Sequence, residues 1–398
     1  MAKQATNRRV RLRSQVATPF GPMDLWIVGA IIALLTTSVV MIYSATIGPA
    51  SRNDLPTYHY LVRQLAYIGI GFLALVLGAF LPYRTWRKLA YPVLMTSIAL
   101  LILLLFVGTE YGNSVRWLNL GFFTIQPSEL AKLAFVVYLA RSIADKTEKM
   151  DSFSIGFLPH LAVLCIIMFL CLVQPDLGTS IILAALMVMM LLVAGTRLSY
   201  LLILFFGGLP IVLGFIAGSS ARVSRMLAYV DPWPLRYDEG FQTINALTSN
   251  GSGGSFGFGV GQGHQSTGGF LPEAESDFIL PVVGEELGFL GIALVTLLFV
   301  ILIVRGATIA RRIKNDFGRF LAFGLTMLIG LQAGINAAVA VGLLPTKGLT
   351  LPFVSFGGSS LIVSMLAAGM LLNLSRHAYA PEQDELDDMD LVPEGGLA

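Results

Sequence analysis

Charged residues are scarce in this chain: only 13% of its 398 residues are acidic or basic, whereas 55% are hydrophobic. A soluble domain cannot bury that much apolar surface, so the composition excludes a protein that folds in water alone. Cysteine is rarer still. Cys165 and Cys171 lie in one apolar segment without a partner pattern, so we expect neither a disulfide nor a cysteine metal site. The four histidines are too scattered to form a metal-ligand spacing.

Long charge-free runs are abundant instead. Each is long enough to cross a hydrocarbon core of about 30 Å as a helix of roughly 20 residues. They cover residues 25–51, 64–83, 89–109, 152–175, 177–196, 198–221, 287–304, 320–346 and 348–375. A tenth, weaker candidate begins near Ser128, where Glu129 and Lys132 interrupt an apolar helix. The sequence therefore predicts an all-α polytopic membrane protein with about ten transmembrane helices.

Basic residues indicate how these helices are oriented. With a cytoplasmic N-terminus, the basic clusters between helices fall inside, as the positive-inside rule requires. These clusters are Arg84, Arg87 and Lys88; Arg141, Lys146 and Lys149; Arg197; and Arg305, Arg311, Arg312, Lys314 and Arg319. Both termini are then cytoplasmic, and a large loop of about 219–278, between helices 7 and 8, is extracytoplasmic. We predict a basic cytoplasmic segment at 1–23, one transmembrane domain at 24–376 and an acidic cytoplasmic tail at 377–398.

Four irregular segments interrupt the apolar helices, and this topology puts all of them on the outer side. They are 110–132 (EYGNSVRWLNLGFFTIQPSELAK), 174–180 (QPDLGTS), the loop at 219–278, and 345–360 (PTKGLTLPFVSFGGSS). Their shared side predicts one composite site that faces outward.

The end of the large loop, LPEAESDFILPVVGEELG at 271–288, runs directly into an apolar helix. Five carboxylates crowd this boundary between water and lipid, where they are costly unless paired or used: Glu273, Glu275, Asp277, Glu285 and Glu286. Asp277 either caps the following helix, a task that Ser276 can share, or acts as a general base whose proton affinity is raised by its neighbours. Glu285 and Glu286 fit a buried structural pair better than direct catalysis.

Other polar residues of these segments also have two interpretations. Glu129 and Lys132 stand one helical turn apart, so they satisfy each other as an ion pair, or Lys132 orients Asp277 or contacts an anionic head group. Trp117 fits an interfacial anchor or a platform for sugar stacking. Asp176 fits an N-cap at least as well as a functional carboxylate.

The outer loop supplies cations. Arg222, Arg225 and Arg236 either bind phosphate oxygens or only solubilise the loop. The run GSGGSFGFGVGQG at 251–263 lacks the GxxxxGK[ST] pattern of a phosphate-binding loop and does not follow a strand. We interpret it as a flexible flap over the site.

In their order and spacing, the motifs LPEAESDFILPVVGEELG, RWLNLGFFTIQPSELAK, QPDLGTS and LPTKGLTLPFVSFGGSS resemble the SEDS (shape, elongation, division, sporulation) family. The resemblance runs from about Asp24 to Arg376. The LPTKGLTLPF motif and the DPW…GFQ…GSGG loop are more similar to the cell-division (FtsW) type than to the elongation (RodA) type. Two departures are visible: Glu275-Ser276 stand where His-Thr is usual, and Phe356 replaces a usual Tyr.

The resemblance implies a ten-helix peptidoglycan glycosyltransferase of the bacterial inner membrane, located at the division septum. Its substrate would be lipid II, the undecaprenyl-pyrophosphate-linked disaccharide-peptide. The family's essential aspartate corresponds to Asp277, the glutamate and lysine of its QPSE…K element to Glu129 and Lys132, and its tryptophan to Trp117.

We therefore expect an inverting glycosyl transfer in which Asp277 removes the proton of an acceptor GlcNAc 4-hydroxyl. That oxygen attacks C1 of the lipid-linked MurNAc, and undecaprenyl pyrophosphate leaves. No cofactor is assigned, because the sequence shows no ligand set for one. A divalent cation such as Mg²⁺ or Mn²⁺ could assist. The residues expected to bind substrate or support the reaction are Lys132, Glu129, Arg116, Trp117, Arg222, Arg225 and Glu273.

The resemblance also implies partners. They are a class B penicillin-binding protein of the FtsI type, which crosslinks the strands, and the FtsQ–FtsL–FtsB regulators; no nucleic acid is expected. The rival functions are a lipid II flippase, the elongation-type polymerase and a scaffold that recruits division proteins. Intramembrane charges such as Glu129, Lys132 and Glu285 would suit a translocation path, but the polar segments gather on one side, which favours the polymerase.

Overall fold

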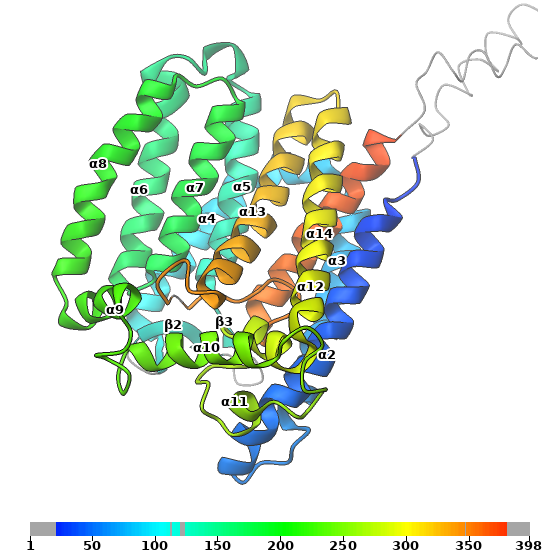
Figure 1. Ribbon diagram of the computed structural model, residues 1–398. Coiled ribbons are helices and arrows are strands. Elements are labelled where there is room, and N and C mark those ends of the chain that lie inside the picture. The colour runs from blue at the N-terminus through cyan, green and yellow to red at the C-terminus, as the bar shows by residue number, and fades with distance from the viewer. Residues whose placement is uncertain (1–20, 112–113, 120–123, 347, 380–398) are drawn as a thin grey trace, which may run out of the picture.

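In the described part of the computed structural model, ten long helices run side by side (Figure 1). The structure describes residues 21–111, 114–119, 124–346 and 348–379, so most of the basic segment at 1–23 and of the acidic tail at 377–398 lies outside the described residues. The long helices are α2 (Leu25–Arg52), α3 (His59–Phe80), α4 (Tyr83–Val107), α5 (Pro127–Ala144), α6 (Leu158–Val173), α7 (Leu177–Val193), α8 (Leu198–Ala217), α12 (Ile279–Arg312), α13 (Asp316–Ala340) and α14 (Gly358–Ala378).

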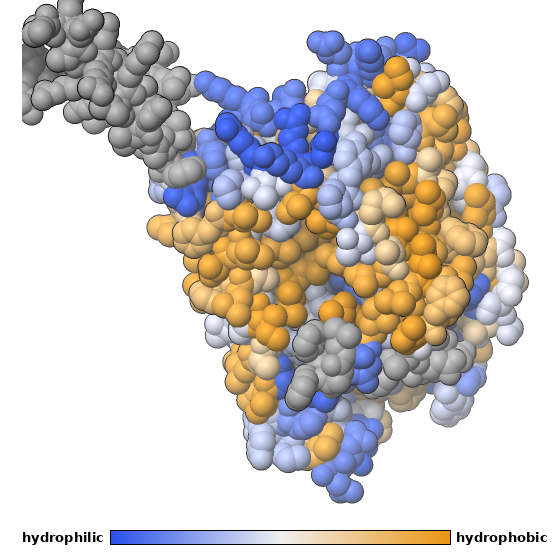
Figure 2. Space-filling view, turned by 180° about the vertical axis from the view of Figure 1, so that it is seen from behind, coloured by the Kyte–Doolittle hydropathy of each residue, from blue (hydrophilic) through white to orange (hydrophobic). Residues whose placement is uncertain are grey.

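The prediction of a polytopic helical membrane protein is confirmed. Eight helices in the described part of the chain are long and apolar enough to cross a membrane. The other two are α7, a shorter apolar helix of 17 residues, and α5, in which Glu129, Lys132 and Arg141 lower the hydropathy. A broad hydrophobic band separates two hydrophilic ends of the molecule in Figure 2, as expected for a surface that contacts lipid.

The shorter elements lie at one end of the bundle, opposite the end where α2 begins and α14 finishes (Figure 1). The large loop forms helices α9 (Ser220–Val230), α10 (Gly240–Ser252) and α11 (His264–Thr267). Three antiparallel strands precede α5, although our sequence analysis predicts none: β1 (Thr109–Tyr111), β2 (Ser114–Asn119) and β3 (Thr124–Ile125). A short 3₁₀ turn (Thr147–Lys149) and a π turn (Phe153–Phe157) connect α5 to α6 at the other end.

Polar side chains fix several helix starts. The carboxylate of Asp24 accepts the N–H groups of Trp26 and Ile27 at the start of α2, and it also pairs with Arg305 of α12 at 2.7 Å. α14 begins at Gly358 and not at 348 as its apolar run predicts. Pro352 in the preceding stretch has no N–H for a helical hydrogen bond, which favours the non-helical backbone found there.

Helix α12 is interrupted at Gly288, whose φ of 68° and ψ of −164° are not helical. The glycine-rich run replaces the hydrogen bonds that the helix loses there. The bonds join Phe258 N to Glu285 O (3.0 Å), Gly259 N to Glu286 O (2.9 Å), Phe289 N to Gly254 O (2.8 Å) and Leu290 N to Ser255 O (3.2 Å). The run therefore clamps the break in α12, and our interpretation of it as a flexible flap is wrong.

The side chain of Glu286 holds the same run, and that of Glu285 holds α11, which directly follows the run; both carboxylates are fully buried. An Oε atom of Glu285 accepts the N–H of Gln265 at 2.8 Å, and one of Glu286 accepts the N–H of Gly261 at 3.1 Å. Ser44 of α2 donates its hydroxyl to the other oxygen of Glu286. These contacts support a structural role for both carboxylates.

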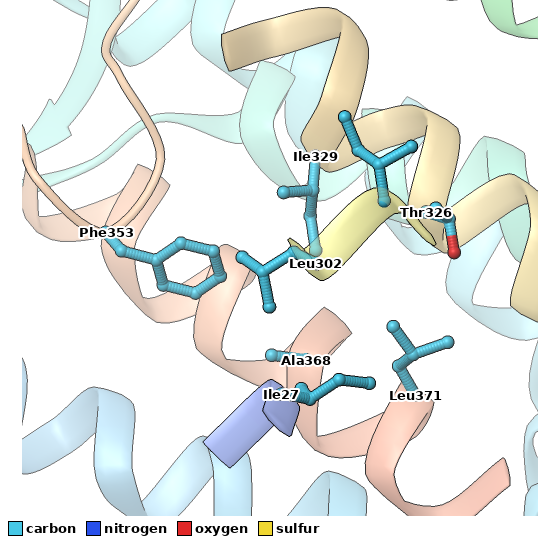
Figure 3. A pocket seen from close by; sticks show the side chains of 8 residues that line it. Ile27, Leu302, Thr326, Ile329, Phe353, Ala368 and Leu371 are labelled. Carbon is cyan, nitrogen blue, oxygen red and sulfur yellow. The ribbon is translucent and has the colours of Figure 1, made fainter. Parts of the chain in front are cut away.

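Packing inside the bundle leaves little empty space. A void of about 10 Å³ lies among Ile27, Leu302, Ile329, Phe353 and neighbouring side chains, which converge from α2, α12, α13, α14 and the segment before α14 (Figure 3). It is too small and too apolar to hold a substrate. α3 and α14 approach so closely that a β-carbon on Gly78 or Gly369 would meet the backbone of the other helix.

Candidate active site

A cavity of about 490 Å³ lies at the end of the bundle that carries β2 and α9 (Figure 1). The four irregular segments of the sequence all contribute to its walls. They supply Arg116; Pro175, Asp176, Leu177 and Gly178; Ser219, Arg222, Arg225, Gln242, Glu273 and Asp277; and Pro345, Thr346 and Gly348. Segments that are up to about 230 residues apart in the sequence thus surround one space.

Asp277 lines this cavity just before α12 begins. It does not cap the helix, because the N-cap position is Phe278 and no side chain accepts the first N–H groups there. The hydroxyl of Ser276 does not cap it either, since it donates to Glu273 Oε2 at 2.8 Å. The capping interpretation of Asp277 is therefore excluded, and its partly buried carboxyl group faces the cavity.

The backbone around Asp277 is held by the segment that precedes α14 and by α13. Three successive carbonyl groups each accept a hydrogen bond from outside the loop. The donors are Phe356 N to Glu275 O (2.8 Å), the Ser355 hydroxyl to Ser276 O, and Asn336 Nδ2 to Asp277 O (2.9 Å). The two departures from the family pattern, Glu275 and Phe356, are thus direct neighbours.

The surroundings of Asp277 favour its protonated form. Burial, followed by the negative charge of Glu273, raises the pKa of Asp277 to about 7, while Arg116 opposes the shift. Glu275 and Asp176 add smaller upward contributions. Burial also raises the pKa of Glu275 above its usual value. A carboxyl group with a pKa near neutrality can accept and release a proton under physiological conditions.

Arg116 of β2 brings a positive charge to the same wall. Its Nε donates to the carbonyl of Gln174 at 3.3 Å, and its Nη2 donates to the carbonyl of Pro175. These bonds hold the guanidinium at the start of α7, where Asp176 caps the helix by accepting the N–H of Thr179 at 3.1 Å. Asp176 therefore combines the predicted cap with a place in the cavity wall.

Arg222 and Arg225 lie one turn apart on α9, and both line the cavity. Arg222 donates to the carbonyl of Phe215 at 2.7 Å and lies over its ring, 3.6 Å from the centroid. Arg225 forms an ion pair with Glu239 at 2.8 Å. Arg236, the third predicted cation, lies over the ring of Tyr237 and is not among the lining residues.

Glu129 and Lys132 are brought together, but they do not line the cavity. Their side chains form an ion pair of 2.8 Å on α5 and are almost completely buried, at 7% and 1% exposed. Trp117 is half-buried in β2, next to Arg116, and is not among the lining residues either.

The matched family model describes the FtsW, RodA and SpoVE cell cycle proteins, and it covers residues 25–380. This chain belongs to that family. The assignment confirms the SEDS resemblance. The chain is 42% identical over 354 residues to the "Probable peptidoglycan glycosyltransferase FtsW" of Geobacter sulfurreducens. The aligned region covers 88% of this chain and 95% of the relative. The chain is 38% identical to the stage V sporulation protein E of Bacillus subtilis, over 89% of this chain and 97% of the relative.

Solved structures of SEDS proteins have the same fold. RodA of Thermus thermophilus matches with a TM-score of 0.64 and 28% identity, over 90% of this chain and 98% of that one. A chain from "Structural coordination of polymerization and crosslinking by a peptidoglycan synthase complex" matches with a TM-score of 0.73 and 28% identity, over 90% and 99%. This SEDS protein is thus a multi-pass membrane protein with the architecture of its relatives.

Several residues of the site were not among the predicted ones, including Gln242, Thr346 and Asn336. Gln242 and Thr346 line the cavity, and Asn336 holds the backbone of Asp277 from inside α13. A polar side chain within an apolar helix is a signal that could have identified Asn336, because such residues are costly in lipid. Gln242 and Thr346 lie in polar loops, where a single polar residue carries no comparable signal.

Within the described residues, no three His, Cys, Asp or Glu side chains are grouped so that they could hold a metal ion. The carboxylates near the cavity are accompanied by Arg116, Arg222 and Arg225, whose guanidinium groups supply positive charge.

Proposed function

We propose that this SEDS protein is a peptidoglycan glycosyltransferase that polymerises lipid II into glycan strands during septal cell-wall synthesis. The observation that carries this proposal is Asp277, a carboxyl group with a pKa of about 7, in a cavity that also contains three arginines. The FtsW relatives, at about 42% identity, support the same reaction and the cell-division type.

Asp277 acts as the general base. Its carboxylate accepts the proton of the GlcNAc 4-hydroxyl as that oxygen forms a bond to C1 of the lipid-linked MurNAc. The bond between C1 and the diphosphate oxygen breaks, and undecaprenyl diphosphate leaves with the electron pair. Attack opposite the leaving group inverts the configuration at C1, and Asp277 then returns the proton to solvent.

The arginines stabilise the diphosphate as its negative charge increases. Guanidinium groups bind phosphate oxygens through paired N–H donors, and such charge-assisted bonds strengthen in a site that excludes water. Arg222 and Arg225 lie one turn apart on α9, so one diphosphate can contact both. Arg116 lies near Asp277 and is the candidate to stabilise the end of the diphosphate that is bonded to the sugar.

Of the other predicted residues, Glu273 lines the cavity, whereas Glu129, Lys132 and Trp117 are not among its lining residues. We assign the Glu129–Lys132 pair to the support of α5, because it is buried and does not line the cavity. Glu273 raises the proton affinity of Asp277. Trp117 extends the strand that carries Arg116, and contact with a sugar ring remains a proposal for it.

We also propose that the enzyme works with a class B penicillin-binding protein of the FtsI type and with the FtsQ–FtsL–FtsB regulators at the septum. The similarity to a chain of a peptidoglycan synthase complex supports an assembly in which polymerisation and crosslinking are coordinated. The polymer emerging from the cavity would be the substrate of that crosslinking partner.

Purified full-length protein, with and without the transpeptidase, is incubated with labelled lipid II, and polymer is resolved by electrophoresis. We expect Asp277→Ala and Asp277→Asn to lose about two to four powers of ten in rate, the usual contribution of a general base. Asp238→Asn, in the same outer loop, is the matched control. Polymer formation by both Asp277 variants at the normal rate would refute the assignment of the base. Movement of lipid II across vesicles without polymerisation would instead favour the flippase.

A further inference from the structure

Asn336 is a polar residue inside the apolar helix α13, with only 2% of its surface exposed. Its side-chain nitrogen donates one hydrogen bond to the carbonyl of Asp277 at 2.9 Å and another to the carbonyl of Leu349 at 2.7 Å. The first carbonyl belongs to the cavity wall that carries the base. The second directly follows Gly348, which lines the same cavity beside the carboxyl group of Asp277.

We propose that Asn336 is a positioning residue that fixes the backbone of Asp277 relative to Gly348 and thereby aims its carboxyl group into the cavity. The inference rests on the proposed function, because it gives Asn336 a task only where Asp277 has one. Asn336 does not line the cavity and acts through the residue that it holds.

The energetic cost of this arrangement indicates that the amide is used. A buried polar side chain in a membrane helix is unfavourable unless its hydrogen bonds are satisfied. Asn336 uses both N–H donors on carbonyl groups of other segments, while its buried Oδ1 accepts no hydrogen bond from the described residues. α13 gains neither of the two bonds for itself, so only the N–H groups of the amide are used. With Ser355 and Phe356 holding the two preceding carbonyls, three successive peptide groups are fixed. The remaining freedom of Asp277 is the rotation of its side chain.

A purely structural role predicts a different pattern, and Gln332 provides the comparison. It lies one turn earlier on α13 and is 3% exposed. Its Nε2 donates to Thr350 O at 3.5 Å and to the Ser360 hydroxyl at 3.3 Å. Gln332 therefore holds the same segment before α14 from the same helix without touching Asp277.

The test compares Asn336→Leu with Gln332→Leu in the full-length protein, using steady-state polymerisation of lipid II and thermal unfolding. Misplacing a catalytic group by about 1 Å costs on the order of 100-fold in rate, so we expect Asn336→Leu to lower kcat by about 10- to 100-fold. KM should change little, since the residues that contact substrate are retained. Gln332→Leu should leave kcat close to that of the wild type.

A second readout does not depend on polymerisation. Labelling of Asp277 by a water-soluble carbodiimide, quantified by mass spectrometry over a pH series, reports where this carboxyl group titrates. In Asn336→Leu the carboxyl group is free to move toward water or Arg116 and away from Glu273, Glu275 and Asp176, so the midpoint should move to lower pH. In Gln332→Leu it should stay in place. Ser355→Ala, a milder change beside Asp277, should give an intermediate shift.

The outcomes separate the two proposals. If Asn336→Leu keeps the kcat and the labelling midpoint of the wild type, the positioning role is overturned. It is also overturned if Asn336→Leu and Gln332→Leu lose kcat to the same extent and unfold at equally lowered temperatures. If Asn336→Leu fails to fold, the midpoint in Ser355→Ala decides, and an unchanged midpoint overturns the proposal. If the wild type makes no polymer, the proposed function fails. The labelling midpoints then still support or overturn the positioning of Asp277 by Asn336.

Discussion

The carboxyl group of Asp277 and the guanidinium of Arg116 both lie beside Gly348, a residue that has no side chain. A β-carbon on Gly348 would lie 3.3 Å from Asp277 Oδ2 and 3.6 Å from Arg116 Nη1. All three residues line the same cavity. The base and one cation thus face a common space, which the glycine keeps open for the reacting sugars.

Filling that space should slow the reaction without unfolding the protein. Gly348→Ala places a methyl group against the carboxylate of Asp277 at a distance that is tighter than ordinary van der Waals contact. Gly348 is not among the residues with positive φ, so alanine fits its backbone conformation. We expect kcat to fall by roughly 10-fold or more, because the acceptor hydroxyl is displaced from the base.

The measurement is the steady-state rate of lipid II polymerisation together with the unfolding temperature. Gly334→Ala on α13 is the control, since its β-carbon would meet no atom within 4 Å. An unchanged rate in Gly348→Ala would show that the substrate does not enter the space between Asp277 and Arg116.

The pH dependence of the reaction should follow the protonation of Asp277. A general base works only when deprotonated, so kcat/KM should fall as the pH decreases through about 7, the pKa of Asp277. Glu273 raises this pKa through its negative charge. Removing that charge in Glu273→Gln should therefore lower the pKa and move the midpoint of the rate profile to lower pH.

Asp238→Asn removes a carboxylate from the same outer loop, and Asp238 is not among the groups that shift Asp277. Its rate profile should match that of the wild type. A midpoint that stays in place in Glu273→Gln, or that moves to higher pH, contradicts the electrostatic account of the site.

Much of this organisation could be predicted from the sequence because lipid imposes strong rules. Apolar runs of membrane length predicted the helix number, and the placement of basic residues predicted that the polar segments meet at one end of the bundle. Asp277 stood out because a carboxylate at the lipid boundary is costly. These rules act on single residues or local windows, so they need no knowledge of distant contacts.

The features that could not be predicted depend on pairs of distant segments. The glycine run at 251–263 looks flexible on its own, yet it completes the hydrogen bonds of α12 around Gly288. The strands near Arg116 are short and lack a clear alternation of apolar residues. Whether Lys132 reaches the cavity depends on how α5 is rotated, and its pairing with Glu129 is compatible with either orientation.

The buried pair of Glu129 and Lys132 should contribute to stability mainly as a unit. Lys132→Met leaves the carboxylate of Glu129 buried without its partner, which typically costs about 3–5 kcal/mol. Replacing both residues, as in Glu129→Gln with Lys132→Met, removes the unpaired charge. The double variant should therefore unfold at a higher temperature than Lys132→Met alone.

Polymerisation by the double variant tests where the pair acts. Since neither residue lines the cavity, we expect the polymerisation rate of the double variant to recover together with its stability. If Lys132→Met loses activity by unfolding, the rate of the double variant should be at least about 10-fold higher than that of Lys132→Met. A double variant that is stable but inactive would assign Lys132 a direct contact with the substrate or its head group.

The break in α12 should be intolerant of any side chain. Gly288 occupies a backbone region that is essentially restricted to glycine, with a cost of about 1–3 kcal/mol for other residues. A β-carbon there would also lie 2.5 Å from the backbone nitrogen of Gly257 and 2.6 Å from that of Phe256. Gly288→Ala should therefore lower the unfolding temperature, and it should increase hydrogen exchange at the amides of Phe258 and Gly259, which donate to α12.

The same change should also lower polymerisation, because the first part of α12 connects the clamp to Asp277. That part spans only Ile279 to Leu287, so a displaced glycine run alters the start of the helix that directly follows the base. Gly207→Ala on α8 is the matched control, since its β-carbon would meet no atom within 4 Å and alanine favours a helix. Normal exchange at Phe258 together with reduced polymerisation in Gly288→Ala would separate the clamp from catalysis, and a normal rate would show that Asp277 is positioned independently of the break.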